Sequence, residues 1–227
     1  MDLRIYCADI GSIRKGKRNF GWACTSAAQE SIEHAHGDAN EIRSVVAMLQ
    51  ADLAERRAVA LGFECPLFVP VHQDANALGS ARQGEVISGE NRAWTANAAA
   101  CVLATGLAQV SWILAELRDT SPGLTAYLDW SAFASAGAGL FLWEAFVTGE
   151  AKRGTHGEDA VAAVEAFREA LPTPMGFDAV EAERPLSLIG AALLWSGWAT
   201  DLEMLSTSCL VIKPRARDAE RAAAKAR

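Results

Sequence analysis

Three short apolar runs in this chain each end on an acidic residue, and this pattern limits the possible folds more than any other. Each run has the length and composition of a buried β-strand. The acids at their ends are Asp9, Glu64 and Glu144. The runs are Leu3–Ala8, Val59–Phe63 and Gly139–Trp143. Because side chains at neighbouring strand ends of an α/β sheet converge into one crevice, we expect the three carboxylates to meet.

Three carboxylates in one crevice repel one another unless a divalent cation lies between them. Ligand sets made only of oxygen suit Mg²⁺ or Mn²⁺. The sequence therefore predicts that Asp9, Glu64 and Glu144 are both metal ligands and catalytic residues of a Mg²⁺ or Mn²⁺ site. A solvated acid at the end of a strand is the alternative for each residue taken alone.

The composition indicates a globular chain with an acidic surface. Of the 227 residues, 51% are hydrophobic, so the chain can bury a substantial core. We predict a single domain over residues 1–213 and a basic C-terminal tail over residues 214–227. The net charge of -7 argues against a general polyanion-binding surface. Nucleic acid is therefore expected to bind only weakly, through a local basic patch.

The cysteines and the first residues favour a cytoplasmic location. The five cysteines are widely spaced and form no CxxC pair, which is typical of buried thiols in a reducing compartment. The first residues do not have the anatomy of a signal peptide. Residues 93–115 carry no charge and are long enough to span a bilayer, but they are rich in alanine and contain polar side chains. We predict a buried helix there and no membrane partner.

The order of the elements predicts an α/β fold with a mixed sheet and helices on both faces. The first three strands follow one another through short turns and are expected to be antiparallel. Helices separate the later strands, as the crossovers between parallel strands require. The predicted strands are 3–9, 19–24, 29–35, 59–64, 124–128, 139–144 and 208–212, and the predicted helices are 42–53, 93–118, 158–171 and 186–199. Residues 66–92 lack regular periodicity, and long irregular loops are often functional.

Several of these segments resemble one known superfamily. Ala8–Ser12 followed by Asn19–Ala23 resembles the first hairpin of the ribonuclease H-like superfamily, in particular of Holliday-junction resolvases and of a broad group of predicted nucleases of unknown function. In that group, a strand ending in an acid and a proline resembles Phe63–Pro66. A later strand that delivers a glutamate resembles Leu142–Glu144, and the loop and helix after it resemble Gly154–Asp159.

The resemblance covers most of the chain, from about residue 3 to residue 212. It implies a ribonuclease H-like sheet and a metal-dependent nuclease. One position departs from the pattern, because the group commonly carries an aspartate in the helix that here begins near Pro185, and Ser187 stands at about that place. Glu181 or Glu183, in the preceding acidic linker, is the candidate fourth acid. Without either of them the site would have three acids.

Other residues are candidates for contacts with a substrate. The basic turn after Asp9 is either a patch that contacts phosphates or a solvated hairpin tip. It comprises Arg14, Lys15, Lys17 and Arg18. His156 is a candidate general acid or base in the loop after the Glu144 strand. Arg82 and Arg92 are candidates for a substrate-binding loop.

These observations favour a hydrolase that cuts phosphodiester bonds in nucleic acid with a divalent metal. Two alternatives remain open. One is a module that keeps a ribonuclease H-like fold without catalysis. The other is a nucleotide-binding protein, since Asp9-Ile10-Gly11-Ser12 also resembles the first phosphate loop of actin-like and sugar-kinase ATPases. A homodimer formed through the long uncharged helix and the Trp195–Trp198 region is one option for the oligomeric state. Burial of these apolar residues in the core of a monomer explains them equally well.

Overall fold

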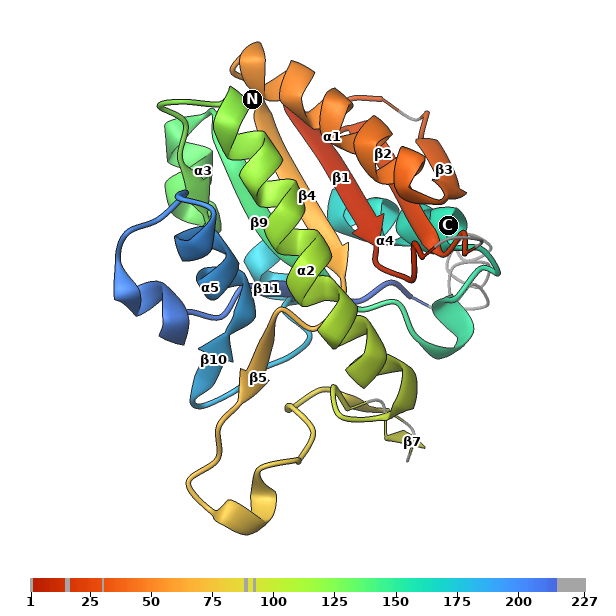
Figure 1. The fold of residues 1–227 in the computed structure, drawn as a ribbon, viewed down its shortest axis with the longest axis vertical. Helices are drawn as coiled ribbons and strands as arrows, with labels where there is room; N and C mark the ends of the chain where they lie inside the picture. Colours follow the sequence, from red (N-terminus) through yellow and green to blue (C-terminus); the bar gives the residue numbers. More distant parts are fainter. Residues whose placement is uncertain (1, 15–16, 30, 88–89, 92, 216–227) are drawn as a thin grey trace.

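A mixed β-sheet forms the centre of the structure (Figure 1). The structure is a computed structural model that describes residues 2–14, 17–29, 31–87, 90–91 and 93–215. The strand order across the sheet is β3-β2-β1-β4-β9-β11, and β8 also pairs with β9. The strands are β1 (Leu3–Asp9), β2 (Phe20–Ser26), β3 (Glu33–Gly37), β4 (Ala58–Glu64), β8 (Ala126–Tyr127), β9 (Gly139–Ala145) and β11 (Leu210–Ile212).

The pairing directions follow from the connections. Strands β1, β2 and β3 form antiparallel pairs, whereas β4 pairs with β1, and β9 with β4, in parallel. Strands β8 and β11 also run parallel to β9. The predicted mixed sheet, antiparallel first and parallel later, is therefore confirmed. Strand β3 begins later than predicted because residues 27–29 still belong to the turn, where Gln29 N–H donates to the carbonyl of Ser26.

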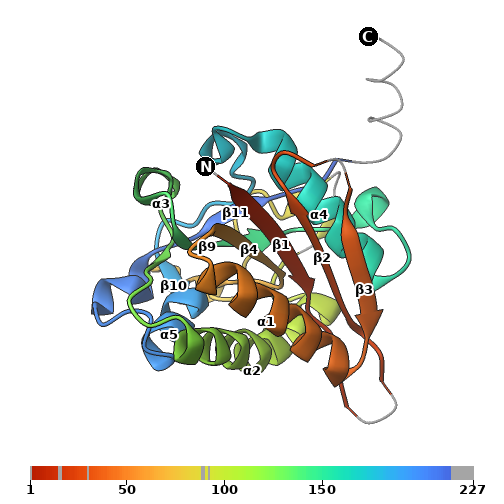
Figure 2. The same ribbon diagram turned by 90° about the horizontal axis from the view of Figure 1, so that it is seen from above.

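Helices cover both faces of the sheet (Figure 2). One face packs against α1 (Ala39–Ala54), α2 (Asn97–Thr120) and α5 (Leu188–Trp195). The other face packs against α3 (Trp130–Ala136) and α4 (His156–Ala170). The alternation of side chains along each strand sends successive residues to opposite cores. Because of this alternation, acidic residues at neighbouring strand ends can point to different faces of the sheet.

Helix α2 is less buried than its uncharged sequence predicts. It is the one helix of the described residues that is long and apolar enough to cross a membrane, and 28% of its most apolar window is buried. The buried stripe includes Val110, Ile113 and Leu117. The opposite face leaves Leu107 48% exposed and Trp112 37% exposed. The prediction of a buried helix is therefore right for one face only, because no second layer covers the other face within the described chain.

The segment between β4 and α2 is irregular for much of its length, as predicted. It contains three short strands and one 3₁₀ turn, which are β5 (Phe68–Pro70), β6 (Val86–Ile87), β7 (Glu90–Asn91) and η1 (Ala75–Ala77). Strand β5 pairs with β10 (Pro185–Ser187), so the first residues of the predicted helix 186–199 form a strand instead. The side chain of Ser187 ends that strand by accepting a hydrogen bond from Gly190 N–H, which caps α5.

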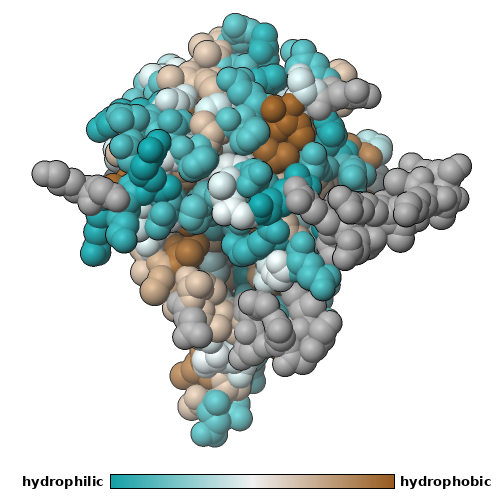
Figure 3. Space-filling model, turned by 90° about the vertical axis from the view of Figure 1, so that its right-hand side faces the viewer, coloured by the Kyte–Doolittle hydropathy of each residue, from teal (hydrophilic) through white to brown (hydrophobic). Residues whose placement is uncertain are grey.

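The remaining connections are short 3₁₀ turns. They are η2 (Gly149–Ala151), η3 (Pro174–Phe177) and η4 (Leu202–Ser206). Most of the predicted basic tail, residues 216–227, lies outside the described residues. The face on the right-hand side of Figure 1 is mostly hydrophilic among the residues drawn in colour, with small, separate hydrophobic patches (Figure 3).

Candidate metal centre

The first two acidic residues are brought together by the register of β1 and β4. Asp9 and Glu64 are the last residues of these strands, and their Cα atoms are direct partners in the parallel ladder. Side chains that are partners in a parallel pair point to the same face. Both carboxylates therefore point to the face covered by α4. Asp9 is 3% exposed, and the side chain of Glu64 is 13% exposed.

The third acidic residue comes from the first turn of α4. Thr155 caps this helix by accepting a hydrogen bond from Glu158 N–H at 3.2 Å. The helix approaches β2 closely, because a Cβ at Gly21 would lie 2.2 Å from the backbone carbon of His156. A Cβ at Gly157 would lie 2.8 Å from the carbonyl oxygen of Ala35. These two glycines therefore allow the start of α4 to lie against the sheet, next to Asp9.

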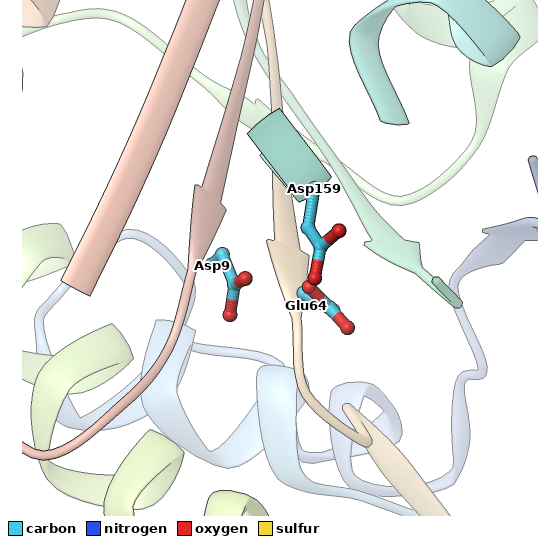
Figure 4. A group of neighbouring side chains, drawn as sticks. All are labelled: Asp9, Glu64 and Asp159. Atoms are coloured by element: carbon cyan, nitrogen blue, oxygen red, sulfur yellow. The ribbon is translucent and has the colours of Figure 1, made fainter. Parts of the chain in front are cut away.

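Asp9, Glu64 and Asp159 form an acidic group at the ends of β1 and β4 (Figure 4). One ligand oxygen from each lies within 4.8 Å of the others. Asp159 is 6% exposed, and its Oδ1 accepts a hydrogen bond from Arg153 N–H at 2.5 Å. This group is able to hold a metal ion. We call it the acidic triad below.

Asp159 is not among the residues predicted for this site, although the sequence carries a signal for it. Asp159 stands four residues before Ala163 and eight before Phe167, both fully buried, so it lies on the apolar stripe of α4. An acid on the buried stripe of an amphipathic helix requires a partner. The helix pattern alone would therefore have marked Asp159 for attention.

A lysine and a histidine border the acidic triad. The Lys152 ammonium lies 3.2 Å from Glu64 Oε1 and 3.3 Å from Asp159 Oδ2, with its side chain half exposed. His156 Nδ1 lies 2.9 Å from Asp9 Oδ2, but the two atoms are not aligned for a hydrogen bond. Asp9 Oδ2 and Glu64 Oε2 are buried and have no hydrogen-bond partner among the described residues. The triad therefore has two buried carboxylate oxygens that a bound cation would satisfy.

Burial makes the charged state of this group costly. It raises the pKa of Asp9 from its usual 3.8 to about 7. Burial, and next the charge of Asp9, raise the pKa of Glu64 well above its usual value. Partial burial lowers the pKa of His156. For Lys152 partial burial also lowers the pKa, but the carboxylates of Glu64, Asp9 and Asp159 outweigh it and raise the pKa. The group therefore favours an added positive charge.

Glu144, the third acid predicted for the site, lies on the other face of the sheet. Its Cα pairs with that of Phe63, one residue before Glu64, so alternation turns its side chain away from Asp9 and Glu64. The guanidinium of Arg82 binds both Glu144 oxygens, at 2.6 and 2.8 Å. Leu67 N–H also donates to Glu144 at 2.9 Å. The structure thus places Glu144 in an ion pair instead of the triad.

Arg82, predicted for a substrate loop, is the other half of this ion pair. Its side chain is 1% exposed and also donates to Glu85 Oε1 at 2.9 Å and to the carbonyl of Phe68 at 3.2 Å. The guanidinium lies over the ring of Phe68. Arg82 therefore joins the irregular segment to β9, and its side chain is almost fully buried. Arg92 lies outside the described residues.

The other predicted residues lie at the surface. Arg14, Lys17 and Arg18 are exposed on the turn after β1, and Lys15 lies outside the described residues. Glu181 and Glu183 are exposed. The backbone of Glu181 pairs with that of Gln83, so this linker runs beside the irregular segment.

A cavity of about 360 Å³ opens beside the acidic triad. Asp9, Glu64, Lys152 and His156 line one side of it. The beginning of α2 and the residues after β9 line another side, and the Arg82–Glu144 pair contributes to its floor. A cavity of this size beside a group that favours a cation is the most prominent candidate site in the described part of the chain.

No protein-family model matches this chain, and comparisons with curated proteins and with solved structures also find no match. What the chain does must therefore be argued from its own geometry.

Proposed function

We propose that this protein is a metal-dependent phosphodiesterase that cleaves nucleic acid and has a ribonuclease H-like fold. One observation carries the proposal. The buried Oδ2 of Asp9 has no hydrogen-bond partner and faces His156 Nδ1 at 2.9 Å, within a triad rich in negative charge of which Asp9 and Glu64 line a cavity. Buried polar atoms normally have partners, and a bound cation would supply the missing one.

The fold supports this proposal. The strand order β3-β2-β1-β4-β9, antiparallel at first and parallel afterwards, agrees with the sheet that the resemblance to ribonuclease H-like proteins implies. Acids at the ends of the first and fourth strands lie side by side, and the helix after β9 adds the third acid. The resembled group commonly carries an aspartate in the later helix, and in this chain Ser187, the N-cap of α5, stands at about that place.

The donor atoms fit Mg²⁺ or Mn²⁺. An octahedral ion with bonds of about 2.1 Å has neighbouring ligands about 3 Å apart. The separation of 2.9 Å between Asp9 Oδ2 and His156 Nδ1 agrees with that spacing. Carboxylates suit both ions, and an imidazole nitrogen favours Mn²⁺, which binds nitrogen ligands more strongly than Mg²⁺ does. We therefore propose Asp9, Glu64 and Asp159 as ligands and His156 as a further ligand, with Mn²⁺ preferred.

The chain supplies the remaining parts of the reaction. A bound ion of this kind would activate water and neutralise charge on the phosphate that is cleaved. The ammonium of Lys152 now holds the place of a counter-ion between Glu64 and Asp159. Once those carboxylates bind an ion, Lys152 is free to contact a phosphate oxygen from the edge of the cavity. The exposed side chains of Arg14, Lys17 and Arg18 would add weak contacts to neighbouring phosphates.

Cleavage of labelled single-stranded DNA and RNA tests this function. We expect hydrolysis in the presence of Mn²⁺, weaker hydrolysis with Mg²⁺ and none with a chelator. Asp159→Asn should lower the rate by at least about a thousandfold, because removing a central group of a catalytic site costs several kcal/mol of barrier. Glu169→Gln, the same chemical change at an exposed position of α4, is the matched control and should cleave normally. Binding of Mn²⁺ without any cleavage would favour the non-catalytic module.

A further inference from the structure

The cavity beside the acidic triad has a second wall that the metal chemistry does not explain. This wall is small and apolar. It consists of Ala93, Ala96, Ala98, Ala99 and Val102 around the start of α2, and of Phe146 and Val147 after β9. The four alanines leave space for a ligand, while Phe146 provides an aromatic surface. A wall of this kind accepts the sugar and base of a nucleotide and does not contribute to holding an ion.

The size of the cavity limits what it can hold. Its volume of about 360 Å³ lies near the lower end for small-molecule sites, which is about 300–1,000 Å³. Specific complexes with duplex DNA bury roughly 1,000–2,500 Å² of protein surface. Among the described residues that line the cavity, Lys152 is the one exposed lysine or arginine, and the chain has a net charge of -7. The space therefore suits one nucleotide and does not suit a length of duplex.

The start of α2 lines this cavity, and no side chain caps the helix. Its N-cap is Ala96, which makes no capping hydrogen bond, and its first turn contains no acidic residue. The first N–H groups of a helix lack an α-helical partner. Here Ala96 N–H donates to the carbonyl of Ala93 and Ala99 N–H to that of Ala96, which, within the described part of the chain, leaves the N–H groups of Asn97 and Ala98 for a ligand. In a long helix the dipole adds about half a positive charge at that end. Phosphate groups bind at helix N-termini for these reasons.

A second, independent observation indicates a ligand in the same cavity. The Asp9 side chain is 4% exposed, lines the cavity, and has an oxygen without a hydrogen-bond partner. The acidic residues thus favour a cation, and the start of α2, which lines the same cavity, offers N–H groups to an anion. A phosphate bound to a metal ion at the acidic triad would face the N-terminus of α2 and satisfy both walls.

We propose that this cavity binds the terminal nucleotide of a single strand, with its phosphate between the acidic triad and the start of α2 and its sugar and base against the apolar wall. The proposal rests on the phosphodiesterase activity proposed above. In the reaction, a water oxygen forms a bond to phosphorus and the bond from phosphorus to the leaving oxygen breaks. The leaving oxygen takes up a proton from the water. The products are a mononucleotide and a shortened strand.

The first test compares a linear single strand with the same strand closed covalently into a circle, both with Mn²⁺. A site for a chain end should release mononucleotides from the linear strand and leave the circle intact. Cleavage of the circle at a rate similar to that of the linear strand would overturn the chain-end proposal. That result would leave the proposed phosphodiesterase function in place, so the two can fail separately.

The second test measures binding and does not depend on cleavage. Adenosine monophosphate is titrated with Mn²⁺ present into the wild type, Ala99→Phe and Ala104→Phe. Ala99 lines the cavity, whereas Ala104 is exposed on the same helix. Filling the cavity should weaken nucleotide binding at least about tenfold, which corresponds to about 1.4 kcal/mol. The affinity for Mn²⁺ alone should not change in either variant.

Each outcome of the nucleotide titrations either supports or overturns the proposed nucleotide site. Equal nucleotide affinity for Ala99→Phe and the wild type would overturn the proposal. Weaker binding by Ala104→Phe as well would also overturn it, because the effect would not come from the cavity. Adenosine without phosphate should bind more weakly than the monophosphate if the start of α2 and the metal hold the phosphate. Nucleotide binding that only Ala99→Phe abolishes, with no cleavage of either strand, would support the nucleotide site and contradict the phosphodiesterase function.

Discussion

Arg82→Met is expected to lower the free energy of unfolding by about 3–5 kcal/mol, because it leaves a buried carboxylate without its counter-ion. Arg82 and Glu144 each have side chains that are 1% exposed. The guanidinium makes two hydrogen bonds to Glu144, one to Glu85 and one to the carbonyl of Phe68. Methionine keeps much of the side-chain volume and contact with Phe68. The decrease in the free energy of unfolding therefore reflects mainly the loss of the positive charge and its hydrogen bonds. Urea unfolding followed by circular dichroism gives the value.

The double variant Arg82→Met/Glu144→Gln is the control for this prediction. It removes the charge of Glu144 as well as the arginine but keeps that of Glu85, so about 1–3 kcal/mol should be regained relative to Arg82→Met. Glu144→Gln alone should leave Mn²⁺ binding close to that of the wild type, because Glu144 lies on the other face of the sheet from the triad. If the double variant were less stable than Arg82→Met, an unpaired Glu144 carboxylate would not be the cause of the stability lost in Arg82→Met.

Asp9→Asn is expected to make the metal-free protein more stable at pH 8 while removing the binding of Mn²⁺. The folded state raises the pKa of Asp9 to about 7, above the unfolded value of about 3.9. The folded state therefore binds this proton more tightly. The stabilisation is fully present below about pH 4 and is lost as the pH rises through about 7. The loss is on the order of 4 kcal/mol for a shift of about three units.

Asparagine has no proton to lose over this range, so the stability of Asp9→Asn should fall less between about pH 4 and pH 8. Thermal unfolding with a chelator present, in steps of pH, measures both curves. Saturating Mn²⁺ should narrow the difference at pH 8, since ion at a hundred times its dissociation constant stabilises only the wild type, by about 2.7 of the roughly 4 kcal/mol that it lost. If the stabilities of the two proteins changed by the same amount between about pH 4 and pH 8, the pKa of Asp9 would not be raised by burial.

The fold was predictable to a large extent because it depends on local patterns. The apolar runs ending at Asp9 and Glu64 are long and bounded by turns, and they form β1 and β4 with those bounds at their ends. Short turns between the first strands and helices between the later ones predicted the pairing directions. The start of the predicted helix 186–199 was wrong because Leu186 pairs with Val69, a contact between distant segments that no local pattern contains.

The site was harder to predict because it depends on register. Glu64 and Glu144 both end apolar runs, but β9 is offset by one residue, so that Glu144 pairs with Phe63 and points to the opposite core. A shift of one residue exchanges the faces of a strand. Asp159 enters through the close packing of α4 on Gly21, which sequence patterns do not show. The placement of Asp9 beside Glu64, by contrast, follows from both strands ending at the same edge.

Isothermal calorimetry of Mn²⁺ binding to the wild type, Asp159→Asn and Glu169→Gln tests the acidic triad most directly. Loss of an outer partner of a metal site costs about 10–100-fold in affinity, and loss of a ligand should cost more. We therefore expect saturable binding by the wild type and Glu169→Gln, and affinity at least about a hundredfold weaker for Asp159→Asn. Equal affinity of all three proteins for Mn²⁺, or no heat of binding from the wild type, would contradict a metal centre at Asp9, Glu64 and Asp159.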